Sequence, residues 1–149
     1  MKRYVLDTST LLHYIRGKTQ FENIESDLGL LKNDVIPILS SVTIGEIEAF
    51  VQRQNWGEPK LKRMKSLLDK MFIVDINAKD EKLMQAYATL WNYSKNALPD
   101  NPFGKSIGIG QNDVWIAATA LAANAVLVST DNDFNHLENS FLTIKIFKS

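Results

Sequence analysis

The stretch from Asp113 to Ser129 constrains the fold more than any other part of the chain. Residues 114–125, VWIAATALAANA, have scarcely a polar side chain, and residues 126–129, VLVS, make a short apolar strand. A helix that is apolar on all sides has to be buried on all sides. We therefore expect the helix at 113–124 to lie between a β-sheet and a further layer of the protein.

Short apolar runs alternate with segments of helical spacing along the whole chain. We expect strands at residues 3–6, 35–41, 72–76, 126–129 and 142–147. We expect helices between them at 9–17, 21–31, 42–55, 61–71, 79–95 and 113–124, with a short one near 131–137. This alternation predicts an α/β fold: a three-layer sandwich with a central, mostly parallel sheet, forming a single domain over residues 1–149. Because Pro37 has no amide hydrogen for a β-ladder, it predicts an edge strand or a bulge.

The composition excludes several classes of protein. Seventeen basic and 17 acidic residues cancel, which argues against a protein that coats nucleic acid but not against an enzyme that contacts it locally. The absence of cysteine excludes disulfides, thiolate catalysis and zinc–cysteine sites. No apolar run approaches the roughly 18 residues of a membrane span, and the first residues do not resemble a signal peptide. We expect a cytoplasmic protein with no membrane partner.

Four acidic residues from separate parts of the chain are expected at one edge of the sheet. Asp7 and Asp131 follow predicted strands, Glu46 lies in the first turn of its predicted helix, and Asp113 opens the apolar helix. In parallel α/β units, the carboxyl ends of strands and the amino ends of helices share an edge, where the ligand sites of open sheets lie. We therefore predict that these four carboxylates meet.

Each acid also has a simpler interpretation. Thr43 and Glu46 match the capping box T-x-x-E, and Glu48 flanks the apolar stripe as Glu46 does. Asn112 is a candidate cap for the helix whose dipole Asp113 would complement. The remaining acids are each placed to cap a helix: Asp7, Asp131 and Asp133. The shared edge favours a common site over four unrelated caps.

A cluster of carboxylates repels itself and has to take up protons or a cation. Near neutral pH, helix N-termini favour the charged form of the acids, so a cation is expected. Oxygen ligands without cysteine or histidine select hard ions such as Mg²⁺ or Mn²⁺. Such ions activate water and bind phosphate oxygens, so the sequence predicts metal-assisted hydrolysis of a phosphodiester.

Several segments resemble, in order, the signature segments of PIN domains, above all those of VapC-type ribonuclease toxins. They are YVLDTSTLL, TIGEIEAF, NDVWIAATALAANAVLVSTDNDF and the final short strand. The resemblance assigns the family's acidic quartet to Asp7, Glu46, Asp113 and Asp131, with Asp133 as a fifth, metal-facing or outer acid. Where the family has Thr before a variable residue and Asp, this chain reads Ser129-Thr130-Asp131, so the choice between Asp131 and Asp133 stays open. The resemblance also implies support from Thr8 or Ser9, and a site lined by Asn112 and Thr130.

The same resemblance implies a function. VapC-type toxins are endoribonucleases that depend on Mg²⁺ or Mn²⁺ and cut structured RNA, such as tRNA or rRNA, to leave a 5′-phosphate and a 3′-hydroxyl. They form homodimers and are neutralised by a small antitoxin. Two alternatives remain: a receiver-like phosphoacceptor domain, and a catalytically silent PIN-like module that binds RNA or protein.

Basic residues outside the acidic edge are candidates for RNA binding. Lys105, in the glycine-rich segment before Asp113, is placed to reach a phosphate. Lys62 and Arg63 belong to a basic helix face that either guides RNA or is simply solvated. His13 and His136 are interpreted as surface or helix-face residues rather than as a catalytic pair.

Overall fold

In the computed structural model, which describes residues 1–100 and 103–148, five parallel strands form one sheet. They are β1 (Lys2–Leu6), β2 (Val35–Ser40), β3 (Phe72–Val74), β4 (Val126–Ser129) and β5 (Ile144–Ile146), in the order β3-β2-β1-β4-β5. The predicted α/β fold class is confirmed. A receiver-like domain would have the order 2-1-3-4-5, so that alternative is wrong. Residues 101–102 of the predicted loop lie outside the described residues.

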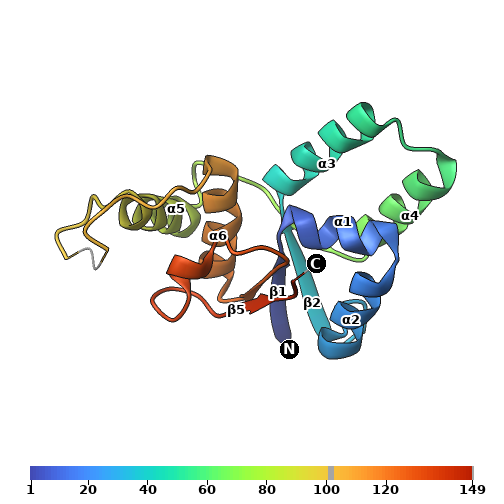
Figure 1. Ribbon diagram of the computed structural model, residues 1–149, viewed down its shortest axis with the longest axis horizontal. Coiled ribbons are helices and arrows are strands. Elements are labelled where there is room, and N and C mark those ends of the chain that lie inside the picture. The colour runs from blue at the N-terminus through green and yellow to red at the C-terminus, as the bar shows by residue number, and fades with distance from the viewer. Residues whose placement is uncertain (101–102, 149) are drawn as a thin grey trace.

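Helices cover both faces of the sheet (Figure 1). One apolar core joins the sheet to α1 (Thr8–Arg16), α2 (Thr19–Leu28), α3 (Ser41–Gln54) and α4 (Glu58–Asp69). The other core joins it to α5 (Glu81–Ser94), α6 (Gln111–Ala123) and the short 3₁₀ helix η1 (Asn135–Leu137). The two cores on opposite faces make the predicted three-layer sandwich.

Helix α6 is buried between the sheet and α5, as its sequence predicts. Val114, Ile116 and three alanines of this helix are 0% exposed. The helix packs against α5 on one side and against β1, β2 and β4 on the other. Small alanine side chains let the backbones approach closely, and this packing fixes the position of Asp113 in the first turn of α6.

Two local predictions at the start of α3 are wrong, and one helix is shorter than expected. Helix α3 begins at Ser41 and is capped by Ser40, whose Oγ accepts from the Val42 amide at 3.2 Å. Thr43 and Glu46 therefore lie inside the helix and make no capping box, and Glu46 is beyond the first turn. The helix expected at 131–137 is only the 3₁₀ turn η1.

Strand β2, expected at an edge or at a bulge, is an inner strand with a continuous register from Lys2↔Val35 to Val5↔Ile38. Its ladder with β3 begins only at Ile38. Pro37 is tolerated because β3 has not yet started beside it.

No helix in residues 1–100 and 103–148 is both long and apolar enough to cross a membrane.

Candidate functional site

Asp7 is the buried anchor of the acidic edge. It directly follows β1 and caps α1, as one of its simpler interpretations predicted: its Oδ1 accepts from the Thr10 amide at 2.9 Å. The same oxygen accepts from Ser9 Oγ at 2.9 Å, and Oδ2 accepts from Ser129 Oγ at 2.6 Å. Thr10 Oγ1 lies 2.7 Å from Oδ1 and 3.0 Å from the Val128 carbonyl oxygen, and its one hydrogen serves either acceptor.

These hydrogen bonds leave room for one further ligand. An ionised carboxylate offers about four lone-pair sites. When Thr10 Oγ1 donates to Val128, the three other donors occupy three of them. Burial raises the pKa of Asp7, although the hydrogen bonds from Ser129, Thr10 and Ser9 lower it.

Glu46 is brought to the same edge through Thr8, the first residue of α1. Thr8 Oγ1 donates to Glu46 Oε1 at 2.6 Å and lies 3.2 Å from Thr43 Oγ1. Thr43 is fully buried, Glu46 is partly buried and Glu48 is exposed. The choice between Glu46 and Glu48, which helical spacing left open, therefore falls on Glu46.

Asp131 is tied to Asp7 through Ser129. The Asp131 amide donates to Ser129 Oγ at 3.1 Å, and that hydroxyl donates on to Asp7. Thr130 Oγ1 donates to Ser9 Oγ at 2.7 Å, and Ser9 also reaches Asp7. Ser129 is thus the hydroxyl that contacts the first acid, and this contact favours the register Ser129-x-Asp131. Asp133 is exposed, and its amide donates to Asp131 Oδ1 at 3.0 Å.

Three hydroxyl residues at this edge were not assigned to the site from the sequence: Thr10, Thr43 and Ser129. Thr10 and Thr43 lie in the first turns of α1 and α3, and Ser129 ends β4. Their positions were a usable signal, but their partners lie in distant parts of the chain.

Asp113 opens onto a pocket of about 420 Å³ lined by Glu46, Gly110, Gln111, Asn112 and Asp113. Helix α6 is capped by Gly110, so the interpretation of Asn112 as its cap is wrong. Asn112 is an exposed residue of the first turn and lines the pocket. The pKa of Asp113 is raised from 3.8 to about 7, first by burial and then by the charges of Asp133, Asp131, Glu46 and Asp7.

Every charge that raises the pKa of Asp113 is a carboxylate, so the acids predicted to meet do act on one another. Oxygen donors with uncompensated negative charge fit a hard divalent cation. Within residues 1–100 and 103–148, no three acidic or histidine side chains are already arranged around a single metal position. The residues fit such an ion chemically, and side chains at the rim have to rotate before they can share it.

The predicted basic residues are exposed or are held by other contacts. Lys105 and Lys62 are exposed. Arg63 has a structural contact: its Nε donates to the Tyr14 carbonyl oxygen at 2.8 Å, and its guanidinium lies 5.0 Å from the ring centre of Phe21. His136 bonds to Ser94 Oγ at 2.7 Å on the α5 side of the sheet, whereas His13 lies on α1. The two histidines therefore lie on opposite faces.

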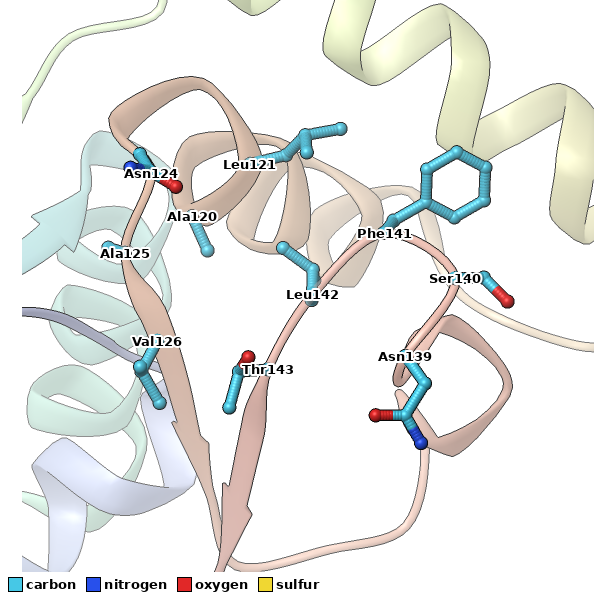
Figure 2. Close-up of a pocket in the computed structure, with 10 residues that line it drawn as sticks. All are labelled: Ala120, Leu121, Asn124, Ala125, Val126, Asn139, Ser140, Phe141, Leu142 and Thr143. Atoms are coloured by element: carbon cyan, nitrogen blue, oxygen red, sulfur yellow. The ribbon is translucent and has the colours of Figure 1, made fainter.

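A second pocket, of about 360 Å³, lies at the opposite edge of the sheet (Figure 2). It is formed where α6 ends and β4 begins, and residues 139–143 close its other side. None of its ten lining residues is charged, so it contributes nothing to the acidic site.

Comparison with known proteins identifies the fold and the family. Ribonuclease VapC2 of Rickettsia felis is 28% identical over 142 residues, which cover 93% of this chain and 95% of that protein. The crystal structure of VapBC2 from Rickettsia felis bound to a promoter DNA fragment superposes with a TM-score of 0.75 at 23% identity, covering 98% and 99% of the two chains. VapBC-1 from nontypeable Haemophilus influenzae gives a TM-score of 0.71 at 21% identity, covering 97% of each chain. Residues 4–139 match the PIN domain family, and the chain belongs to that family.

Proposed function

We propose that the protein is a divalent-metal-dependent endoribonuclease and the toxin of a VapBC-type toxin–antitoxin pair. One observation carries the nuclease proposal: at one open edge of the sheet, burial and then carboxylates from three other parts of the chain raise the pKa of Asp113 to about 7. The similarity to Ribonuclease VapC2 supports RNA as the substrate. The likeness in fold to VapBC complexes supports a small antitoxin as the partner.

The proposed ligands of Mg²⁺ or Mn²⁺ are Asp7, Glu46, Asp113 and Asp131, with Asp133 as an outer or fifth acid. A bound ion of this kind lowers the pKa of a water molecule and stabilises charge on phosphate oxygens. The protein contributes hydrogen bonds that hold two of these carboxylates in position. Ser129, Ser9 and Thr10 hold the Asp7 carboxylate, and Thr8 holds Glu46.

The finer points rest on the family resemblance. We propose structured RNA, such as tRNA or rRNA, as the target, with products that carry a 5′-phosphate and a 3′-hydroxyl. A homodimer is the proposed assembly. A gene for a small DNA-binding protein beside the gene for this chain would support the toxin role, whereas an isolated gene would indicate a free-standing nuclease.

The test is cleavage of tRNA and rRNA by the purified protein with Mg²⁺ or Mn²⁺, with and without a chelator. We expect Asp113→Asn and Glu46→Gln each to reduce the rate by roughly two orders of magnitude or more, because each removes a proposed metal ligand. Glu48→Gln is the matched control, since it removes the same charge from an exposed site on the same helix. Full cleavage by Asp113→Asn, or in the chelator, would overturn the proposal. RNA binding without cleavage would favour the catalytically silent module.

A further inference from the structure

The bend between α1 and α2 forms a pocket that the proposed chemistry does not use. It encloses about 530 Å³ and is lined by His13, Arg16, Lys18, Thr19 and Gln20. Three of these five residues are basic or can become so, and none is acidic. Arg16 and Lys18 are exposed. Although the wall of the hollow is mostly apolar, Arg16 and Lys18 put positive charge at its mouth, and that charge attracts an anion.

The bend is held by contacts from two other parts of the chain. Gly17 ends α1 with φ 68°, and its amide donates to the His13 carbonyl oxygen. The Arg63 guanidinium packs against it: a Cβ at position 17 would lie 3.0 Å from its central carbon. On the other side, Gln20 Nε2 donates to the carbonyl oxygens of Phe147 and Lys148 at 2.6 and 3.0 Å. Arg63 therefore adds a positive charge beside the bend, and the C-terminal segment is held next to it.

This pocket and the acidic edge share helix α1. Asp7 caps the helix, and His13 lies six residues further on, a distance of about 9 Å along the axis at about 1.5 Å per residue. The pKa of His13 is lowered by burial and by Arg16 and is raised by the charge of Asp7, so the acid and the basic pocket lie within electrostatic reach. The arrangement puts positive charge beside a negative centre.

That pairing suits a polyanion that is cut at one point and held at another. The acidic edge repels RNA phosphates, so a nuclease has to obtain binding energy from positive groups nearby.

We propose that the His13–Arg16–Lys18 pocket binds one backbone phosphate of the single-stranded RNA whose cleaved bond lies at the acidic edge. The inference rests on the proposed function, because it takes RNA as the substrate, but it concerns RNA binding and not cleavage. Phosphate contacts carry no sequence information, so the pocket fixes the strand in register and leaves the choice of sequence to other parts of the surface.

The competing location is the basic face of α4, where Lys62 and Lys65 are exposed. The α1 pocket is favoured because its charges surround a hollow and belong to the helix that Asp7 caps. The lysines of α4 lie on a convex helix face, and the Lys60 ammonium is already 5.0 Å from the ring centre of Trp56.

The experiment measures RNA binding separately from cleavage. In an Asp113→Asn background, a fluorescent single-stranded RNA of about 12 nucleotides is titrated by anisotropy in KCl from about 50 to about 200 mM. The double variant Arg16→Gln/Lys18→Gln is compared with Lys62→Gln/Lys65→Gln, which loses the same charge. Circular dichroism checks that both fold, and a second RNA of unrelated sequence tests sequence dependence.

Loss of one phosphate contact reduces the slope of log K against log salt by about 0.7, which weakens binding roughly fivefold near 0.1 M salt. We expect this change for the Arg16/Lys18 variant with both RNAs, and an unchanged slope for the Lys62/Lys65 variant. An unchanged slope for Arg16/Lys18, or the change in the α4 variant instead, would overturn the inference even if the wild type cleaves RNA. The expected slopes in a wild type that never cleaves RNA would support the pocket and refute the nuclease.

Discussion

Asp7 and Asp113 lie at the same edge of the sheet but in different surroundings. Asp7 is 3% exposed and accepts hydrogen bonds from Ser9, Thr10 and Ser129. Asp113 is only half-buried, beside an open pocket, and other carboxylates act on it. Burial raises the pKa of both, but at Asp7 hydrogen-bond donors oppose that shift and at Asp113 negative charges add to it.

This difference indicates that the two acids have different roles at the acidic edge. The Asp7 carboxylate joins the end of β1 to Ser129 at the end of β4, so it belongs to the framework of the fold. Asp113 contributes repulsion that the folded protein has to tolerate. A protein keeps such a residue for what it binds, because burying like charges together destabilises the fold.

The largest expected effect tests this difference by replacing each of the two residues, in separate variants, with alanine. We expect Asp7→Ala to lower the free energy of unfolding by about 3 kcal/mol, since it removes a helix cap and leaves buried donors without an acceptor. Asp113→Ala should change it by less than about 1 kcal/mol, because the loss of helix-dipole stabilisation is offset by relief of repulsion. Urea unfolding at pH 8 without divalent ions measures both. Equal losses would mean that the two acids do not differ as described.

The second prediction uses pH. Between 3.8 and about 7, Asp113 holds its proton in the folded protein and loses it on unfolding, so the free energy of unfolding falls as pH rises through this range. Allowing for solvent screening, we expect a loss of about 2 kcal/mol from Asp113. The pKa values of Asp7 and Asp133 are raised too, so they act in the same direction.

Urea unfolding at several pH values checks this sign, with Asp113→Asn as the control. The variant should lose less stability than the wild type across the same range. A wild type whose stability rises toward pH 8 would show that Asp113 is not held in a repulsive cluster.

The third prediction sharpens the role of Asp113 as a binding residue. At pH 8, Mg²⁺ or Mn²⁺ at about ten times its Kd should stabilise the wild type by about 1.4 kcal/mol, since an ion that binds only the folded state adds its binding free energy. Thermal unfolding measures this without any RNA. Glu46→Gln and Asp113→Asn should lose most of the effect, and Glu48→Gln should keep it. An equal response from all four proteins would place the ion elsewhere.

The sequence predicted the parts of this site that follow from topology. Parallel strands and returning helices bring strand ends and helix starts to one edge whatever the side chains do, so Asp7, Asp113 and Asp131 could be placed together. The apolar sequence of α6 likewise predicted its burial. Helical spacing could not separate Glu46 from Glu48, because both flank the apolar stripe. The contact with Thr8, 38 residues away, decides between them.

The side-chain hydrogen-bond networks could not be predicted from the sequence either, because their partners lie far apart along the chain. The role of Ser129 depends on Asp7, 122 residues earlier, and on the amide of Asp131. The cap of α3 moved from Thr43 to Ser40 because both residues have cap chemistry and only the end of β2 selects one. Arg63 was a candidate for RNA binding or for a solvated face, yet the α1–α2 bend supplies it with a carbonyl oxygen and an aromatic ring.

The smallest expected effect concerns Asp131 and Asp133, the two acids that follow β4. Asp131 is connected to the surroundings of Asp7, and Asp133 to those of Asp113. Asp131 is bound to the Asp7 network through Ser129, whereas Asp133 is exposed and is the first of the charges that raise the pKa of Asp113. We expect Asp133→Asn to slow RNA cleavage only about threefold, or about 0.7 kcal/mol, and to lower the pKa of Asp113. Asp131→Asn, the matched change, should slow it far more. Single-turnover cleavage rates and the pH dependence of unfolding measure the two effects. If Asp133→Asn proved the more damaging, the fourth ligand would be Asp133, and Ser129 would serve only to position the chain between β4 and η1.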